Sequence, residues 1–304
     1  MPEANASDPS AAAAARDAVE SASAFAHPAV APDATAAYGE HPDQLVDFYA
    51  PRDVPTEGAP LVVLLHGGAW RTPYDRVHVS PFADFLARRG FAVANVEYRR
   101  GREGALPQQR AAGQAAPVAG RWPETFDDVA AAMDALPRLA PPALPGVDLR
   151  RTVVTGHSAG GQLALWAAAR HVLPADSPWR LARPPVLRGV VALAPIADLA
   201  LSVELDVCGG AVGQLMGDAA DFAQRSAAVD PALLLPTGMA TTVVHGRDDI
   251  VVPVAVSESF VTAAAKAGET VGLTLLEDVG HFPLIDPATD ACAVVMEELA
   301  QLAW

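Results

Sequence analysis

The chain has 304 residues, of which 51% are hydrophobic and 19% are charged, and its formal net charge is −15. Because the balance is so acidic and Lys266 is the single lysine, we expect neither nucleic acid nor an anionic membrane as a partner. No stretch reaches the roughly twenty unbroken apolar residues of a membrane span. A chain of this length can bury one large core, so a single α/β domain is expected.

Cysteines and histidines give no sign of a metal site. Cys208 and Cys292 form no disulfide framework and no cluster, and both are expected to be small buried hydrophobic residues. No pair of histidines has metal-ligand spacing with a third ligand in support, so we predict no metal and no cofactor.

The N-terminal segment is rich in Ala, Ser, Pro and Asp. It lacks the basic start and the continuous apolar core of a signal peptide, so a cytoplasmic location is expected. We predict a disordered tail, at most transiently helical, over residues 1–35 and a single domain over residues 36–304.

Strand and helix patterns alternate along the rest of the chain. An alternating pattern within residues 38–49 predicts antiparallel strands, and the apolar run 61–65 predicts a buried parallel strand. This alternation predicts an α/β fold, with an open, mostly parallel sheet and helices on both faces. Further strands are predicted at residues 91–96, 151–155, 190–194, 241–245 and 271–276, and further helices at 81–89, after Trp122, after Ser158, at 254–267 and after His281.

Three segments interrupt this alternation. Residues 101–120 are rich in Gly, Ala, Gln and Pro without a clear period, which predicts a mobile loop or a part of the pocket wall. The helix that starts near Trp122 is expected to end at its prolines, the first of which is Pro137. Residues 199–240 contain short helical pieces and predict a small cap insertion over the pocket.

The segment around Ser158 has the order strand, G-x-S-x-G, helix. That order is typical of a nucleophile elbow, in which a sharp turn projects the serine hydroxyl. Gly156 and Gly160 suit such a turn because side chains at these positions would collide with the flanking strand and helix. The alternative is a Gly/Ser-rich loop without chemistry.

A glycine pair follows the buried strand 61–65 directly. Gly67 and Gly68 allow the backbone to pass close to a ligand with its N–H groups pointing inward. The functional interpretation is an oxyanion hole shared with the N–H of Ala159, and the alternative is an ordinary Gly-rich strand exit.

An acid and a base follow two later strands. Ser158, the pair Asp248-Asp249 and His281 each come directly after a predicted strand, so all of them should lie at the carboxyl edge of the sheet. A serine needs an imidazole to take its proton, and the imidazole needs a carboxylate to orient it. We favour Asp249, which stands four residues before Pro253, while Asp248 and Asp198 remain alternatives.

These motifs give the chain a resemblance to the α/β-hydrolase superfamily over about residues 38–304. The combination of H-G-G-x-W with G-H-S-A-G-G resembles, more narrowly, the esterase/lipase-like group that includes kynurenine formamidases and small carboxylesterases. The resemblance is carried by H-G-G-A-W at 66–70, G-H-S-A-G-G at 156–161, H-G-R-D-D-I-V-V-P at 245–253 and G-H-F at 280–282.

The resemblance implies a serine hydrolase that cleaves a small carboxylic ester through an acyl-enzyme. An arylformamidase acting on N-formylkynurenine-type amides is the alternative, and a non-catalytic protein that binds a small ligand is a third. A small-molecule ester or amide is the expected partner, and a homodimer stays open. The implied roles are nucleophile for Ser158, acid for Asp249, base for His281, oxyanion donors for Gly67, Gly68 and Ala159, and a substrate-binding wall for Trp70.

Overall fold

One sheet forms the frame of the molecule. The computed structural model describes residues 9–52, 57–101 and 118–304. The strands are β1 (Ala34–Ala37), β2 (Leu45–Tyr49), β3 (Pro60–Leu65), β4 (Ala92–Val96), β5 (Asp148–His157), β6 (Gly189–Leu193), β7 (Thr241–Gly246) and β8 (Gly272–Leu276). Within the described residues they form one eight-stranded sheet in the order β1-β2-β4-β3-β5-β6-β7-β8. Only the β1–β2 and β2–β4 pairs are antiparallel, which confirms the mostly parallel sheet.

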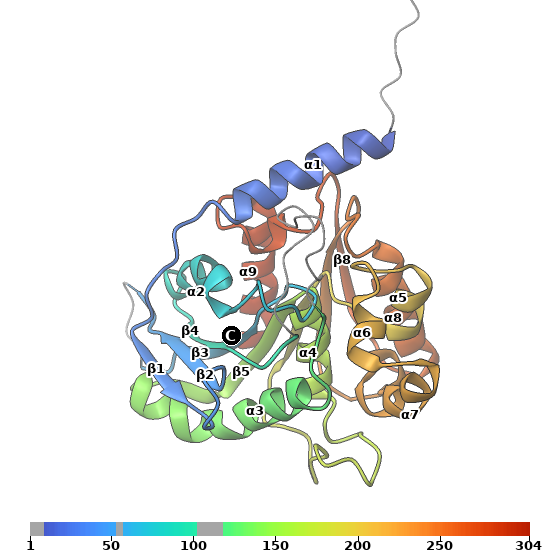
Figure 1. Cartoon of the computed structure of the whole chain (residues 1–304). Coiled ribbons are helices and arrows are strands. Elements are labelled where there is room, and N and C mark those ends of the chain that lie inside the picture. The colour runs from blue at the N-terminus through green and yellow to red at the C-terminus, as the bar shows by residue number, and fades with distance from the viewer. Residues whose placement is uncertain (1–8, 53–56, 102–117) are drawn as a thin grey trace, which may run out of the picture.

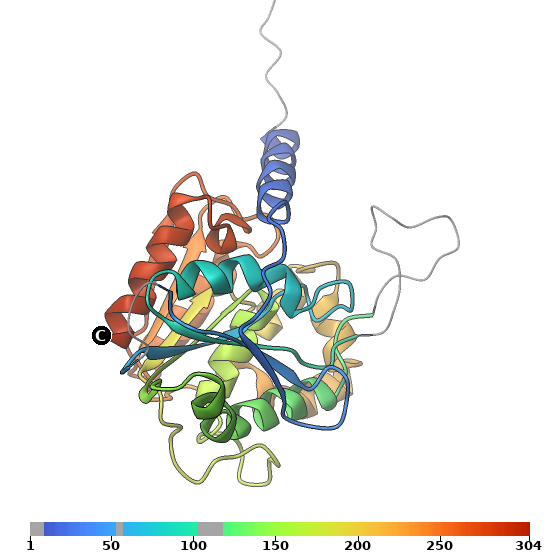
Figure 2. The same cartoon turned by 90° about the vertical axis from the view of Figure 1, so that its left-hand side faces the viewer.

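Helices cover both faces of this sheet (Figures 1 and 2). They are α1 (Pro9–Ala24), α2 (Ser80–Ala87), α3 (Glu124–Ala143), α4 (Ala159–Ala168), α5 (Leu199–Glu204), α6 (Ala211–Met216), α7 (Ala219–Val229), α8 (Val254–Lys266) and α9 (Asp290–Ala303). The central strand β3 shows why both faces are covered. Its Leu61, Val63 and Leu65 belong to the core that includes side chains of α3, α4 and α8, while Val62 and Leu64 belong to the core that includes side chains of α2 and α9. A strand that is apolar on both faces therefore specifies a sheet between two helical layers.

The N-terminal segment differs from the prediction of a disordered tail over residues 1–35. Residues 9–24 form the helix α1, and β1 begins at Ala34, before the predicted domain boundary. The run of alanines favours a helix, but a short alanine-rich helix is marginal in water by itself. It is stabilised here by contacts with the loops that follow β7 and β8, which are described below.

The helix α3 also differs from the prediction, because it continues through Pro137, Pro141 and Pro142 to Ala143. An interior proline costs a helix about 3 kcal/mol through a lost N–H and a steric clash. Burial of apolar side chains such as Leu136 and Leu139 against the sheet offsets this cost. Tertiary packing thus overrides the local signal that predicted an early end.

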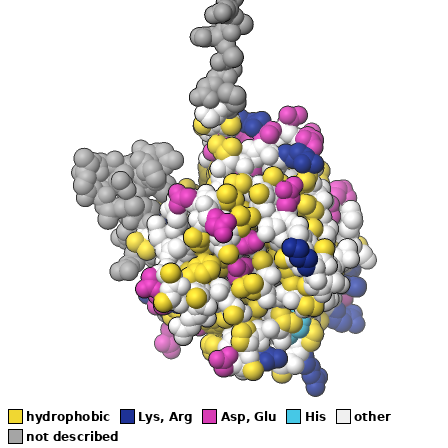
Figure 3. Space-filling view, turned by 90° about the vertical axis from the view of Figure 1, so that its right-hand side faces the viewer, with side chains coloured by type: hydrophobic (Ala, Val, Ile, Leu, Met, Phe, Trp, Pro, Cys, Tyr) yellow, Lys and Arg dark blue, Asp and Glu magenta, His cyan; other side chains and the backbone are white. Residues whose placement is uncertain are grey.

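The 199–240 insertion consists of α5, α6, α7 and a short 3-10 turn, Pro231–Leu233. Figure 3 shows the face that carries these helices, where hydrophobic and acidic side chains mix with scattered basic ones. Its function as a cap stays a prediction, and most of the predicted 101–120 loop lies outside the described residues. No helix in the described part of the chain has the length and apolar character needed to span a bilayer.

A buried carboxyl group in this insertion leads to a pH-dependent prediction. Asp230 is 1% exposed and accepts hydrogen bonds from the backbone N–H groups of Leu199 and Ala232. Burial raises its pKa from 3.8 to about 6. The folded state therefore binds the Asp230 proton more tightly than the unfolded chain does. The stability contributed by protonated Asp230 is lost as pH rises from about 4 through 6.

The variant Asp230→Asn removes this titration and keeps an acceptor oxygen for the two N–H groups. We expect its free energy of unfolding, relative to the natural protein, to increase by about 2 kcal/mol between about pH 4.5 and pH 8. Urea unfolding at the two pH values measures the change. A difference that is independent of pH would contradict the raised pKa.

Candidate active site

Ser158 lies at a strained turn between β5 and α4. Its backbone has φ 57° and ψ −119°, a conformation that is costly for a residue with a side chain. An added Cβ at Gly156 would lie 2.2 Å from the Gly160 carbonyl oxygen, and one at Gly160 would lie 2.1 Å from the Leu65 carbonyl oxygen. Both positions therefore exclude any side chain, and α4 begins immediately after the serine. The turn has the geometry expected of a nucleophile elbow.

The Asp249 carboxylate joins the loop after β7 to the loop after β8. Its Oδ2 accepts a 2.6 Å hydrogen bond from His281 Nδ1, and its Oδ1 accepts from the backbone N–H groups of Val251 and Val252 at 2.8 Å. His245 Nε2 also lies 3.2 Å from Oδ2. Burial by itself raises the pKa of this carboxyl, but the attraction of His281 and the hydrogen bonds from His245 and His281 outweigh it and hold the pKa well below its usual range. The group is therefore a carboxylate that orients the imidazole.

The two alternative acids have other partners. Asp248 forms a salt bridge of 2.8 Å with Arg16 of α1. Asp198 caps α5 by accepting from the N–H of Leu201 and also accepts from the Ser259 hydroxyl. Of the three aspartates considered, the structure brings only Asp249 to the ring of His281.

The sequence motif assigned no role to His157, the residue before Ser158. Its Nε2–H donates to the carbonyl oxygen of His281 at 2.9 Å, and the two ring centroids are 4.3 Å apart. Burial lowers the pKa of His157 well below its usual value, and His281 lowers it further, so the ring is neutral. His157 therefore holds the His281 loop beside the elbow. No signal in the sequence distinguishes this contact from an outward-pointing residue.

Ser158 and His281 are each 2% exposed. Among the described residues, the hydrogen bonds do not include one from the Ser158 hydroxyl to the His281 ring. Such pairs are commonly looser in an unliganded site than in the substrate complex.

Gly67 lies directly against the elbow. An added Cβ there would lie 2.8 Å from the His157 carbonyl oxygen and 3.4 Å from the Ser158 Cβ. Gly68 has φ +103°, and a Cβ on it would lie 2.2 Å from the Cβ of Tyr74. The next residues, Ala69 and Trp70, also have positive φ, so the loop turns tightly at this point. The Gly67 backbone thus lies against Ser158, and α4 begins at the next residue, Ala159.

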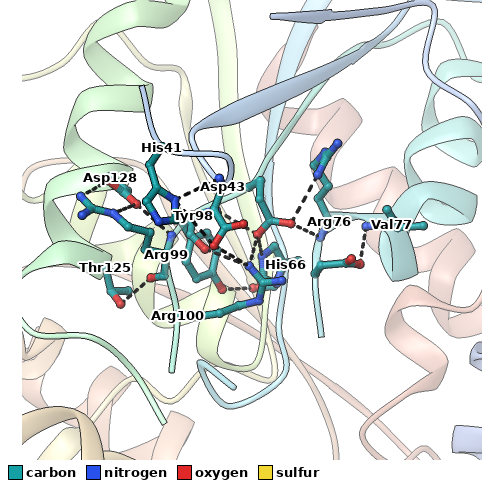
Figure 4. Close-up of polar contacts among 12 residues, drawn as sticks. His41, Asp43, His66, Arg76, Val77, Tyr98, Arg99, Arg100, Thr125 and Asp128 are labelled. Atoms are coloured by element: carbon teal, nitrogen blue, oxygen red, sulfur yellow. Dashed lines mark hydrogen bonds and ion pairs between the residues drawn. The ribbon is translucent and has the colours of Figure 1, made fainter. Parts of the chain in front are cut away.

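A buried polar network holds the start of this loop (Figure 4). His66 donates from Nε2 to the Glu97 carboxylate at 2.8 Å and stacks on the ring of Tyr98, whose hydroxyl donates to the His66 carbonyl oxygen. Arg100 donates to the same carboxylate at 2.7 Å. Burial raises the pKa of Glu97, but attraction to His66 and the hydrogen bonds lower it to about 2. The Glu97 carboxylate is therefore charged at neutral pH, and its hydrogen bonds hold the end of the strand.

Trp70 lies in the hydrophobic core, where its side chain is fully buried. Its role as a substrate-binding wall stays a prediction. Its indole N–H has no hydrogen-bond partner among the described residues. The backbone of Trp70 has a positive φ, and the H-G-G-x-W pattern reveals neither this angle nor the burial of the ring.

Metal ligation finds no support in this part of the chain. The described residues contain no group of three or more His, Cys, Asp or Glu side chains that could hold a metal ion. Cys208 and Cys292 are free thiols, and only Cys292 is fully buried.

Comparison with known proteins identifies the family of the chain. The BD-FAE family model matches residues 46–263, which is most of the chain. The chain belongs to the BD-FAE family. The match spans the Gly67 loop, the Ser158 elbow and the Asp249 loop, and it ends before His281.

Two curated relatives of this BD-FAE protein are esterases by name. Esterase LipC of Mycobacterium tuberculosis is 27% identical over 272 residues, which are 83% of this chain and 60% of LipC. A probable isoprenylcysteine alpha-carbonyl methylesterase of rice (Oryza sativa subsp. japonica) is 25% identical over 257 residues, which are 80% of this chain and 56% of that protein. The BD-FAE protein thus spans somewhat more than half the length of these relatives.

Solved structures of esterases share the fold. Esterase B from Lactobacillus rhamnosis superposes with a TM-score of 0.70 at 20% identity and covers 96% of this chain and 94% of its own. Esterase 2 of Thermogutta terrifontis gives a TM-score of 0.62 at 20% identity, with 88% of this chain and 92% of its own covered. At such identities the likeness supports the α/β-hydrolase fold.

Proposed function

We propose that this BD-FAE protein is a serine carboxylesterase that hydrolyses small carboxylic esters through an acyl-enzyme on Ser158. The observation that carries the proposal is the buried Asp249–His281 pair, which His157 holds beside the strained serine. The esterase relatives support an ester as the substrate class.

In the proposed mechanism, His281 removes the proton from Ser158 Oγ as the hydroxyl attacks the ester carbonyl carbon. Asp249 keeps Nδ1 protonated, so that Nε2 is the free base, and it stabilises the imidazolium that forms. The imidazolium then protonates the departing alkoxide. A water molecule, activated in turn by His281, attacks the acyl-enzyme and releases the acid.

The negative oxygen of each tetrahedral intermediate needs donors that are in place before the reaction. We assign this function to the backbone N–H groups of Gly67, Gly68 and Ala159, because that loop and the start of α4 meet at Ser158. One such donor typically contributes about 3–4 kcal/mol of transition-state stabilisation.

A comparison of rates on two substrate classes tests the proposal. We expect kcat/KM on p-nitrophenyl acetate or butyrate to exceed that on N-formylkynurenine by at least about tenfold, because the relatives are esterases by name. The Ser158→Ala variant is the blank for both substrates. A higher kcat/KM on the formamide would replace this proposal with an arylformamidase.

A further inference from the structure

The helix α1 spans the edge of the sheet where the proposed catalytic loops lie (Figure 1). Arg16 binds Asp248 at 2.8 Å, and the Glu20 carboxylate accepts from the backbone N–H of Gly280 at 3.1 Å. Beyond these, Ser23 donates to Asp286 at 2.6 Å. The positions 16, 20 and 23 share one face of a helix, so this face is turned to the body of the protein.

Each of the first two contacts is made next to a member of the Asp–His pair. Asp248 directly precedes Asp249, and Gly280 directly precedes His281. One helix therefore holds both the loop that carries the proposed acid and the loop that carries the proposed base.

Packing after α1 strengthens the same connection. The ring of Phe25 contacts Phe282, the residue after His281, edge to face with centroids 5.5 Å apart. His27 Nε2 lies 2.7 Å from the Asp286 carboxylate. The His281 loop is thus held by contacts to residues that precede and follow His281 in the chain.

The Glu20 carboxylate is attracted by Arg16, one turn earlier on α1, but forms no salt bridge with the described residues. One of its oxygens accepts from Gly280, while the other is buried without a partner among the described residues. Burial raises the pKa of this carboxyl, and the Gly280 N–H opposes that shift. Glu20 is only partly buried, and its hydrogen bond to Gly280 connects α1 directly to the residue before His281.

We propose that α1 is a positioning helix for catalysis and that Glu20 is its positioning residue, which holds the His281 loop in register through the Gly280 N–H. The inference rests on the proposed esterase function. Glu20 does not touch the reacting atoms; it acts through the backbone next to the base. Displacement of a catalytic group by about 1 Å can cost up to about 100-fold in rate, so a contact of this kind is measurable.

Three variants test the contact in the full-length protein. Glu20→Ala removes the acceptor, and we expect kcat on p-nitrophenyl butyrate to fall about tenfold while KM changes less than about twofold. Glu20→Gln keeps an acceptor oxygen and should retain kcat within about threefold. The matched control is Val19→Ala, a 70% exposed neighbour on the same helix, which should leave both constants unchanged.

Gly280→Ala breaks the contact from the opposite side. An added Cβ would lie 2.1 Å from Glu20 Oε2 and has only Glu20 atoms as its nearest neighbours, so the carboxylate must move away. We expect a loss of kcat like that of Glu20→Ala, and the double variant should be no slower than the slower single variant. If the loss of kcat in the double variant equals the product of the two single losses, the two changes act independently, and the proposal is overturned.

The remaining outcomes separate this inference from the esterase proposal. The positioning role is overturned if a folded Glu20→Ala protein has an unchanged or increased kcat, or if the Ala and Gln variants lose kcat equally. In each of these cases, Ser158-dependent turnover of the natural protein still supports the esterase proposal. If Glu20→Ala does not fold, Gly280→Ala decides, since an unchanged kcat there overturns the role. Absent ester turnover by the natural protein is a failure of the proposed function itself.

Discussion

The variant Ser158→Ala is expected to lose about 10⁵-fold or more in kcat, because the hydroxyl forms the covalent bond to the acyl group and no neighbour replaces it. The fold should be retained, since alanine fits the same space and the turn is specified by Gly156 and Gly160. Steady-state kinetics on p-nitrophenyl butyrate measures the loss, and circular dichroism checks the fold.

Covalent labelling gives an independent control for this result. A fluorophosphonate should add one equivalent to Ser158 of the natural protein, and none to the alanine variant, as detected by intact mass. A loss of less than tenfold in kcat, or labelling that persists in the variant, would show that Ser158 is not the nucleophile. Absence of any adduct on the natural, folded protein would favour a non-catalytic ligand-binding protein.

The variant Asp249→Asn is expected to lower kcat on the order of 10⁴-fold. A neutral amide neither stabilises the imidazolium nor holds the Nδ1 proton of His281, so the ring loses its correct tautomer. KM should change little, because Asp249 is buried behind the imidazole. The measurement is kcat and KM on p-nitrophenyl butyrate.

Asp248→Asn is the matched control, with the same change of charge one residue away. Its side chain is partly exposed and bonded to Arg16, and asparagine still offers that arginine an acceptor, so we expect kcat to stay within about fivefold. A larger loss for Asp248→Asn than for Asp249→Asn would show that Asp248, and not Asp249, is the acid that supports His281.

Local patterns in the sequence were sufficient for the frame of the protein. The two-sided apolar run at Leu61–Leu65 predicts a strand buried between two layers of helices, because it leaves no polar face for water. The glycines around Ser158 predict the turn, because a Cβ at either would overlap backbone atoms. Such signals act over a few residues, so they can be read without knowing the rest of the fold.

Contacts between distant segments account for what the sequence left open. Asp248 and Asp249 are neighbours in the chain, and only the tertiary structure shows that the second reaches His281, 32 residues away, while the first reaches Arg16 in α1. The place of His157 beneath His281 depends on a contact across 124 residues.

Burial and docking were likewise decided by the tertiary structure. The sequence marked Trp70 as part of a motif, but only the structure shows its positive φ and the burial of its ring in the core. The alanine-rich N-terminus was predicted to be a tail, because helix propensity by itself is too weak to stabilise a short helix. What holds α1 is a set of contacts, among them Arg16 and Glu20, with loops more than two hundred residues further along the chain. The sequence by itself thus determined the sheet and the turn at Ser158, because both depend on local patterns. The choice of Asp249, the contacts that hold His281 and the position of α1 depend on which distant segments meet in the folded protein.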